Sequence, residues 1–250
     1  MPEHDDPLLL AEQVNALPRP WLIGVDVDGT LAPIVSRPED SALEPLAREA
    51  LAALADRVGV MVAVVSGRPL HDLRHKFELP EHVMLLGSHG AEAGSEIDAR
   101  SDDEELLLQA TIDTMLGVAD DLDGAWIEHK PLAVALHVRQ ADPTRALQAL
   151  ADIEPVLQGL GAITLHRGKM VLEAAVRPTS KKTAFGRLRE RLEPATTLFI
   201  GDDGSDEHVF QSLADHDIAI KVGPGPTAAA HRLALPRDVV QFLTMLAANR

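Results

Sequence analysis

The sequence predicts an α/β fold in which a core with a parallel sheet carries an inserted α+β module. Two apolar runs, Trp21–Val27 (WLIGVDV) and Val60–Val65 (VMVAVV), lack the polar alternation of half-exposed strands, and such runs are typical of strands buried in a parallel sheet. Between them, Leu43–Arg57 places Leu and Ala at helical spacing. Strand, helix and strand in this order form a βαβ unit.

The same kind of order continues on both sides of the insert. Before it, the pattern predicts a helix over Leu70–Phe77 and a strand over Val83–Leu86. After it, strands are expected over Thr197–Ile200 and Ile218–Val222, and helices over Ser180–Leu192, Asp206–Ala214 and Asp238–Ala247.

The middle of the chain has a different order of elements. A long acidic helix is expected over Asp102–Leu122, and a second helix over Pro143–Leu157. Each is followed by two strands, namely Trp126–Lys130 with Ala133–Arg139, and Ile163–His166 with Met170–Val176. We therefore expect a core formed by residues 1–97 and 178–250 and an α+β module formed by residues 98–177.

Composition restricts the classes of partner. The 250 residues contain 39 acidic and 23 basic side chains, and a net charge of −16 argues against nucleic acid or an anionic membrane surface. The absence of cysteine excludes disulfides and thiolate metal sites. The acidic start lacks a signal peptide's basic region, and no apolar run reaches the ~20 residues that cross a bilayer. A soluble, cytoplasmic protein is expected; the sequence does not determine its oligomeric state, and a monomer is the working expectation.

Two aspartates follow the first predicted strand. Asp26 and Asp28 lie in GVDVDGTLAPI, at the strand end where open α/β sheets bind ligands. Carboxylates this close repel each other, and a divalent cation such as Mg²⁺, which prefers hard oxygen ligands, resolves that repulsion. An acidic turn is the simpler alternative. A calcium loop is excluded because its twelfth position, which requires Glu, is Arg37.

A second acidic cluster follows a later predicted strand. In LFIGDDGSDEHVF, Asp202 and Asp203 come directly after the apolar run, and Asp206 lies one turn further on. Alone, this segment is also consistent with helix capping, because Asp and Ser favour helix starts. Two acidic strand ends in one sheet favour a shared metal site, with candidate ligands Asp26, Asp28, Asp202, Asp203 and Asp206.

Two further segments carry groups suited to phosphate. Ser66, Gly67 and Arg68 follow the strand VMVAVV and offer a hydroxyl, backbone N–H groups and a guanidinium. Lys181 lies at the start of the predicted helix TSKKTAF, and the N-terminus of a helix favours phosphate. Each feature alone is weak, because three-residue motifs and surface lysines are common.

Together these four segments resemble the four motifs of the haloacid dehalogenase (HAD) superfamily of phosphatases, in the same order. The resemblance extends from residue 21 to about residue 222. It implies a HAD-like, Rossmannoid core with a parallel sheet and a cap domain formed by the insert. It also implies that Asp26 is the nucleophile, forming an aspartyl-phosphate, and that Asp28 is the general acid and base.

The same resemblance assigns the remaining motif residues. Ser66 and Lys181 are implied to hold the phosphoryl group. Asp202 is implied to complete a Mg²⁺ site with support from Asp203 or Asp206, and which of these two touches the metal is left open. The lysine motif departs from the family's usual K-G, because Lys181 is followed by Lys182, so either lysine could reach the phosphate.

Charged residues of the insert are candidates for substrate recognition. Residues two or four apart on a strand share a face, which pairs Glu128 with Lys130, His137 with Arg139, and Lys169 with Glu173. The last pair shares a face only if GKMVLEAAV is one continuous strand. Such groups can hydrogen-bond a polyol, and a solvated sheet face with cross-strand ion pairs is the alternative.

The combined pattern resembles the trehalose-6-phosphate phosphatase family. The resemblance rests on G-S-H-G-A-E at Gly87–Glu92, E-x-K followed by H-x-R, G-K-x-x-x-E, and G-D-D-x-S-D-E, with Ser205 in place of the family's Thr. It implies Mg²⁺-dependent hydrolysis of trehalose 6-phosphate to trehalose and phosphate, a step of trehalose biosynthesis. It implies that the disaccharide is bound, and its phosphate oriented, by Glu128, Lys130, Arg139, Lys169 and Glu173. Further substrate contacts are expected from Gly67, Arg68, His89 and His137.

Three alternatives stay open. The same chemistry could act on another sugar phosphate, such as sucrose 6-phosphate or mannosyl-3-phosphoglycerate, although the cap residues favour trehalose 6-phosphate. A phosphomutase would return the phosphoryl group to the sugar. A non-catalytic sugar-phosphate binding protein would be expected to lack the nucleophile or the acid, yet Asp26, Asp28 and Lys181 are all present.

Overall fold

The computed structural model describes residues 4–35, 37–93, 101–130, 132–168, 170–177 and 180–248. The chain folds as two units. The first comprises Met1–Ile97 together with Ser180–Arg250, and the second comprises Asp98–Thr179. The sequence analysis predicted an insert over residues 98–177.

A seven-stranded sheet forms the centre of the first unit. Its order is β11 (His231–Leu233), β10 (Ile218–Val222), β9 (Thr196–Gly201), β1 (Trp21–Val25), β2 (Val60–Val65), β3 (Met84–Gly87) and β4 (Glu92–Ala93). All neighbours are parallel except β3 and β4. The predicted α/β core is confirmed. β1 pairs with both β2 and β9, so the chain runs outward from it in both directions, and ligands bind at such a switch point in open α/β sheets.

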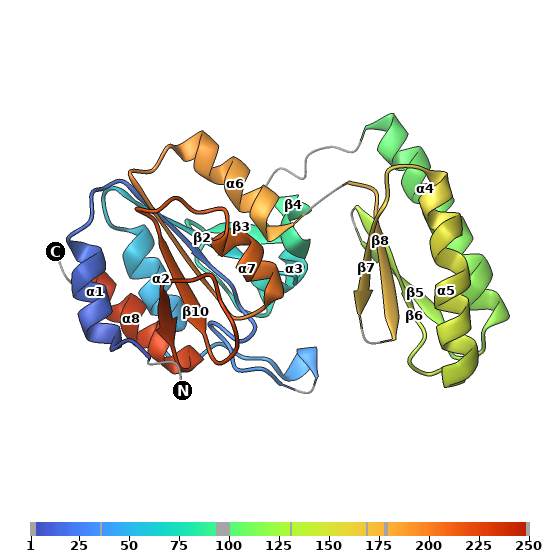
Figure 1. Ribbon diagram of the computed structural model, residues 1–250, viewed down its shortest axis with the longest axis horizontal. Coiled ribbons are helices and arrows are strands. Elements are labelled where there is room, and N and C mark those ends of the chain that lie inside the picture. Colours follow the sequence, from blue (N-terminus) through green and yellow to red (C-terminus); the bar gives the residue numbers. More distant parts are fainter. Residues whose placement is uncertain are drawn as a thin grey trace. The chain divides into compact units, whose positions relative to one another are not determined.

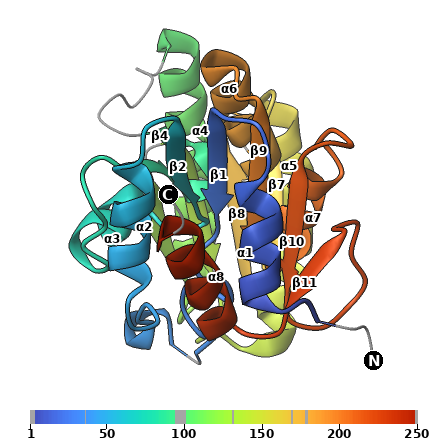
Figure 2. The same cartoon turned by 90° about the vertical axis from the view of Figure 1, so that its left-hand side faces the viewer.

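Helices cover both faces of this sheet (Figures 1 and 2). One layer contains α1 (Pro7–Asn15), α2 (Ala47–Ala55), α3 (Leu70–His75) and α8 (Pro236–Ala248), and the other contains α6 (Lys181–Leu192) and α7 (Gly204–Phe210). The alternation of a strand distributes its side chains between the two layers. Trp21, Ile23 and Val25 of β1 join the core cluster of the first layer, whereas Leu22 joins that of Phe185. Both faces of β1 are buried, which explains its uninterrupted apolar sequence.

Some element boundaries differ from those expected. α2 begins at Ala47 instead of Leu43, because Leu46 has a φ of 67°, which no α-helix accommodates. The sequence analysis did not anticipate α1, β4 or β11. For α1 a local signal existed, since the Asp6 carboxylate accepts hydrogen bonds from the N–H groups of Leu8 (2.8 Å) and Leu9 (3.2 Å), and Pro7 takes the first helical position.

The second unit is an antiparallel sheet with two helices on one face. The strand order is β5 (Trp126–Lys130), β6 (Ala133–His137), β8 (Val171–Ala175) and β7 (Thr164–Gly168). α4 (Asp102–Asp121) and α5 (Pro143–Leu160) supply Met115, Ile153 and Leu157, which pack with Val134 and Leu136 of β6. One sheet face is thereby buried, and the residues that alternate with these lie on the other face. The predicted α+β module is confirmed.

An ion pair joins the two ends of this unit. Arg177, just after β8, donates from Nε to Glu104 Oε1 (2.7 Å) and from Nη2 to Oε2 (2.8 Å). Glu104 also completes the capping box of Ser101 at the start of α4. These hydrogen bonds, of which those from Arg177 contribute most and that from the Ser101 N–H contributes next, lower the pKa of Glu104 to about 2.

None of the helices in the described part of the chain combines the length and apolar character needed to cross a bilayer.

Candidate active site

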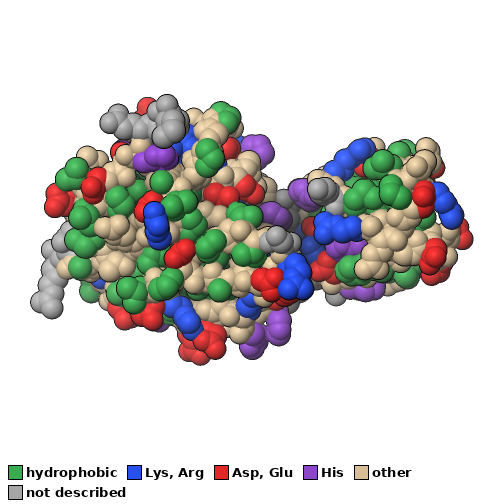
Figure 3. Space-filling view, turned by 90° about the horizontal axis from the view of Figure 1, so that it is seen from below, with side chains coloured by type: hydrophobic (Ala, Val, Ile, Leu, Met, Phe, Trp, Pro, Cys, Tyr) green, Lys and Arg blue, Asp and Glu red, His purple; other side chains and the backbone are tan. Residues whose placement is uncertain are grey.

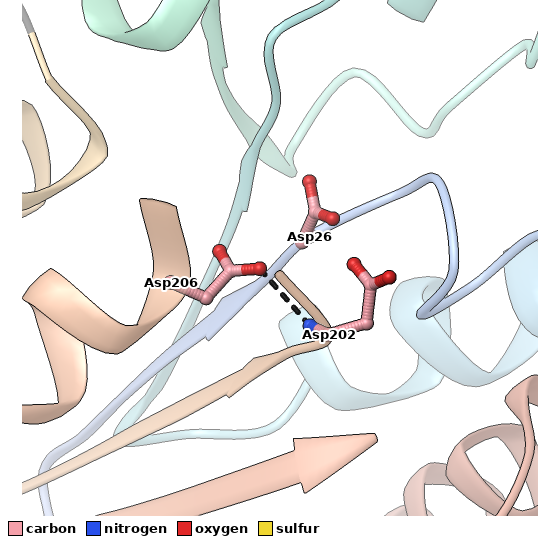
Figure 4. A group of neighbouring side chains, drawn as sticks. All are labelled: Asp26, Asp202 and Asp206. Atoms are coloured by element: carbon pink, nitrogen blue, oxygen red, sulfur yellow. Dashed lines mark hydrogen bonds between the residues drawn. The ribbon is translucent and has the colours of Figure 1, made fainter. Parts of the chain in front are cut away.

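Three carboxylates converge at the carboxyl edge of the core sheet. β1 and β9 are parallel neighbours with Val25 opposite Ile200, so Asp26 and Asp202, which lie just beyond these strands, come to the same edge. Asp206 joins them from the first turn of α7. Each residue offers an oxygen, and these three oxygens lie within 4.8 Å of one another (Figure 4). The predicted meeting of two acidic strand ends is therefore present in the fold.

Lys181 supplies the positive charge beside two of these carboxylates. Its Nζ lies 2.8 Å from Asp26 Oδ1 and 2.9 Å from Asp206 Oδ1, and only 3% of the side chain is exposed. The residue is the first of α6, whose capping box is formed by Ser180 and Thr183. Helical geometry turns the neighbouring Lys182 outward, and its side chain is exposed.

The charges in this cluster are unbalanced. Burial raises the pKa of Asp26 and of Asp206 to about 7 and that of Asp202 to about 6, with repulsion among the carboxylates adding to the effect. Burial lowers the pKa of Lys181, but Asp26 and Asp206 outweigh it and raise that pKa, so the ammonium keeps its proton. The ammonium of Lys181 thus contacts two of the three carboxyl groups, and the third, Asp202, experiences the charges of both Lys181 and Lys221.

The donor set fits a divalent cation. Asp202 Oδ1 is buried and has no hydrogen-bond partner within the described residues. A buried oxygen without a partner is costly, and a cation with hard oxygen ligands would satisfy it. Asp26, Asp202 and Asp206 are therefore the residues of this cluster that can hold a metal ion.

Asp203 forms the capping box of α7 together with Asp206, whose Oδ2 accepts from the Asp203 N–H (3.1 Å). Its carboxylate caps α7 by accepting from the N–H groups of Ser205 (2.8 Å) and Asp206 (3.2 Å) and from the Ser205 hydroxyl (2.6 Å). Burial raises the pKa of Asp203, but the charge of Lys181 and these hydrogen bonds outweigh it and lower that pKa to about 2. The sequence left Asp203 and Asp206 open as supporting ligands. The structure brings Asp206 to the cluster and engages Asp203 in capping.

Asp28 lies outside the group of three carboxylates and is held by other partners. Arg68 donates from Nε to Asp28 Oδ2 (2.5 Å) and from Nη2 to Oδ1 (2.7 Å), and the Ser41 hydroxyl donates to Oδ1 (3.0 Å). A forked guanidinium fixes a planar carboxylate in orientation as well as position. Arg68, expected as a substrate contact, thus has Asp28 as a partner. Ser41 was missed, because no local pattern marks a serine that arrives from a loop 13 residues away.

The Ser66–Gly67–Arg68 loop packs against His89. The Arg68 N–H donates to Ser66 Oγ (3.1 Å), and the His89 N–H donates to the Ser66 carbonyl oxygen (2.9 Å). A Cβ placed on Gly67 would lie 2.7 Å from the His89 ring, so a larger residue here would have to displace that ring. The buried Glu92 holds the adjoining turn by accepting from the Leu70 N–H (3.1 Å) and from the Ser88 hydroxyl.

Gly29 and Lys221 determine the surroundings of Asp202. Gly29 has a φ of 88°, and a Cβ there would lie 2.1 Å from Asp202 Oδ2, so the turn after Asp28 admits only glycine. The buried Lys221 of β10 donates its ammonium to the Asp202 carbonyl oxygen. The sequence analysis missed Lys221, although a lysine inside the apolar strand IAIKV was a signal that could have marked it.

The cap residues expected to bind substrate lie largely on the sheet face opposite the helices. The register places Glu128 and Lys130 of β5, His137 of β6 and Glu173 of β8 on this face, which we call the polar cap face. Lys130 forms an ion pair with Glu173, and His137 Nε2 lies 3.0 Å from Glu128 Oε2. Ala133 and Ala135 lie between these side chains and leave room for them.

Two expectations about this face need correction. β6 ends at His137, so Arg139 lies beyond the strand. Strand alternation therefore no longer places the side chains of His137 and Arg139 on the same face. β8 begins only at Val171, and Met170 has a φ of 65°, so the segment up to Glu173 is not one continuous strand. The condition for a common face of Lys169 and Glu173 is therefore not met, and Lys169 itself lies outside the described residues.

Surface charge is mixed on the face seen in Figure 3. Asp and Glu side chains are spread over both units, with Lys, Arg and His side chains among them. The excess of 16 negative charges is thus not gathered on one part of this face.

Several known proteins are similar in sequence to this chain. The model of the trehalose-phosphatase family matches residues 24–236. An uncharacterized glycosyl hydrolase of Mycobacterium tuberculosis is 34% identical over 247 residues, covering 90% of this chain and 18% of that protein. Trehalose-phosphate phosphatase of Mycobacterium bovis is 32% identical over 241 residues, covering 89% of this chain and 60% of the relative. This chain thus spans less than two thirds of the length of these relatives.

A solved structure agrees with these sequence matches. The structure of Aspergillus fumigatus trehalose-6-phosphate phosphatase superimposes with a TM-score of 0.67 at 26% identity, and the match covers 98% of each chain. Both the parallel core and the inserted cap are therefore matched. The family match likewise includes the strand ends that carry Asp26 and Asp202, the cap, and Lys181. The chain belongs to the trehalose-phosphatase family of the HAD superfamily.

Proposed function

We propose that this protein hydrolyses trehalose 6-phosphate to trehalose and phosphate. The observation that carries the proposal is the placement of Lys181 between Asp26 and Asp206 at the carboxyl edge of the sheet, in a chain of the trehalose-phosphatase family. A carboxylate nucleophile beside a buried ammonium suits phosphoryl transfer, where positioning and charge compensation dominate.

The first chemical step is attack by Asp26 on the phosphorus. A carboxylate oxygen of Asp26 forms the new P–O bond while the bond between phosphorus and the sugar oxygen breaks, which gives an aspartyl-phosphate and an alkoxide-like leaving group. Asp28 donates a proton to that oxygen, and Lys181 offsets the charge of the phosphoryl oxygens. Ser66 and the backbone of the loop it begins offer hydrogen-bond donors to the same group.

The second step releases phosphate. Asp28, now a carboxylate, accepts a proton from water as the water oxygen attacks the phosphorus, and the bond to the Asp26 carboxylate breaks. The same residue thus serves as acid and then as base. In the second step the Asp28 carboxylate is oriented by the hydrogen bonds that Arg68 and Ser41 donate to it.

A divalent cation, which we take to be Mg²⁺, is proposed to be held by Asp26, Asp202 and Asp206. When bound, it supplies positive charge to the phosphoryl oxygens. This part of the proposal is supported by the buried Asp202 Oδ1, which has no hydrogen-bond partner among the described residues. It is also supported by the repulsion among three carboxyl groups whose oxygens lie within 4.8 Å of one another.

Metal binding should depend on pH in a defined direction. Protons compete with the cation for carboxyl groups whose pKa values are raised to about 6 and 7, so we expect Mg²⁺ to raise Tm more at about pH 8 than at about pH 5. Thermal unfolding with and without Mg²⁺ measures this. Asp202→Asn should shrink the shift at the higher pH, and an equal shift at both pH values would contradict the assignment.

We propose that the polar cap face recognises the disaccharide. Glu128, Lys130, His137 and Glu173 present acceptors and donors on one side of the cap sheet, as hydroxyl recognition requires. Arg139 and Lys169 remain predicted substrate contacts. Monomeric assembly and cytoplasmic location also remain predictions.

Phosphate release from three sugar phosphates tests the proposal. Trehalose 6-phosphate, sucrose 6-phosphate and glucose 6-phosphate are compared with Mg²⁺ and with EDTA. We expect a preference for trehalose 6-phosphate of about 100-fold or more in kcat/KM, because a site built to pair hydroxyls rejects sugars that leave its groups unpaired. EDTA should remove the activity. Equal turnover of all three would contradict the role of the cap, and no turnover of any would favour a binding protein.

A further inference from the structure

A tryptophan on the polar cap face is not used by the proposed mechanism. Trp126 begins the edge strand β5, and 48% of its surface is exposed. It lies directly opposite His137 in the strand register, and the two rings stack with centroids 4.0 Å apart and an interplanar angle of 4°. One face of the indole is thus covered by the imidazole, while much of the ring stays open to solvent.

The position of this ring is fixed by a hydrogen bond behind it. His137, which stacks on Trp126, also lies with Nε2 3.0 Å from Glu128 Oε2. Trp126 and Glu128 are two residues apart on β5, so their side chains leave the same face about 7 Å apart. A flat apolar surface and a carboxylate acceptor are therefore held side by side before any ligand binds.

This combination suits a pyranose ring. A pyranose presents C–H groups on its ring faces and hydroxyls around its rim, so a flat aromatic surface can pack on the first while a carboxylate accepts hydrogen bonds from the second. Trp offers a large, rigid apolar area at low cost in conformational entropy. Lys130 and Glu173, on the same face, extend the supply of polar groups.

We propose that Trp126 is a stacking platform for a pyranose ring of the substrate and thereby determines specificity for a sugar phosphate. The inference rests on the proposed function, because it assumes that the polar cap face receives the sugar. If the Trp126–His137 pair served only to stabilise the sheet, it would contribute to the free energy of unfolding through cross-strand packing alone. Its loss would then change stability without changing substrate affinity.

Steady-state kinetics of Trp126→Ala and Trp126→Phe provide the first test. We expect Trp126→Ala to raise KM for trehalose 6-phosphate about tenfold, with kcat changed less than about twofold, because stacking contributes roughly the free energy of one aromatic contact. Trp126→Phe should retain most of the affinity. Neither variant should change kcat/KM for p-nitrophenyl phosphate, which has no sugar ring. Leu147→Ala, at an exposed position on α5, is the matched control and should match wild type.

Tryptophan fluorescence provides a second test without turnover. The chain has two tryptophans, and Trp21 is fully buried in the core sheet. Titration with trehalose should therefore change the emission through Trp126, and the change should disappear in Trp126→Phe. A signal that persists in this variant would overturn the proposal.

The outcomes separate this inference from the proposed function. If wild type hydrolyses trehalose 6-phosphate and Trp126→Ala has an unchanged KM, the stacking role is wrong and the function stands. If wild type hydrolyses p-nitrophenyl phosphate but not trehalose 6-phosphate, the proposed function is wrong. A Trp126→Ala variant that loses activity equally on both substrates overturns the stacking role, and thermal unfolding identifies it as destabilised.

Discussion

Asp26→Asn is expected to reduce kcat for trehalose 6-phosphate by at least about 10⁴-fold, because an amide oxygen is a poor nucleophile towards phosphorus. The substitution is nearly isosteric, so the Asp26 position at the end of β1 should keep its packing. It also removes one ionised group from a cluster in which burial raises the pKa of Asp26 to about 7. The folded variant is therefore expected to be at least as stable as wild type without metal.

Two measurements check this expectation. Phosphate release under saturating substrate gives kcat, and thermal unfolding in EDTA gives the stability of the metal-free protein. Asp120→Asn, on α4 of the cap, serves as a matched control in which only a surface carboxylate changes. Retention of more than a few per cent of wild-type kcat in Asp26→Asn would contradict the nucleophile assignment.

Lys181→Met is expected to impair both catalysis and folding. The ammonium lies within 2.9 Å of both Asp26 Oδ1 and Asp206 Oδ1, so its loss should lower kcat about 10³-fold, as when one charge-stabilising group is removed from an active site. It also leaves two buried carboxyl groups without their cation. Breaking a buried ion pair in this way costs about 3–5 kcal/mol in unfolding free energy.

The cost of Lys181→Met should depend on pH. In the folded protein the pKa of Asp26 is about 7, against 3.8 for an ordinary Asp, so the folded state retains a proton that the unfolded chain releases as pH rises between these values. Stability therefore falls as pH rises through this window. Without Lys181 the pKa rises further, so the variant should be destabilised more at about pH 8 than at about pH 5.

A neighbouring lysine provides the control for this prediction. Lys182→Met removes the same charge one residue away, at an exposed position on the same helix. Denaturant unfolding in EDTA at both pH values measures the stability, and phosphate release measures kcat. Equal effects of the two substitutions would contradict the role given to Lys181.

The gathering of acidic residues at one edge of the sheet was predictable because its signals are local. An apolar run followed by aspartate marks a strand end, and parallel strands bring such ends to one edge, which is how Asp26 and Asp202 meet. The choice between Lys181 and Lys182 was not predictable from residue type, since the two are adjacent. It depends on the phase of α6, which buries Lys181 and exposes Lys182.

Residues that arrive from elsewhere in the chain carry no such signal. Ser41 reaches Asp28 from a loop, and Lys221 reaches the Asp202 carbonyl oxygen from β10. Neither contact follows from spacing, because each requires the register of the folded sheet and loops. In the cap, strand alternation correctly placed Glu128 with Lys130 on one face. It failed where a strand ended early, as β6 does at His137, and where one began late, as β8 does at Val171.

The central claim is that a phosphoryl group passes from trehalose 6-phosphate to Asp26. Rapid mixing of wild-type protein with this substrate and Mg²⁺, followed by an acid quench and peptide mass spectrometry, tests it directly. We expect the peptide that contains Asp26 to gain the mass of one phosphoryl group within the first turnover, and to gain none in Asp26→Asn. Rapid phosphate release from trehalose 6-phosphate by Asp26→Asn, or a phosphoryl group on another residue of the wild-type protein, would contradict the account.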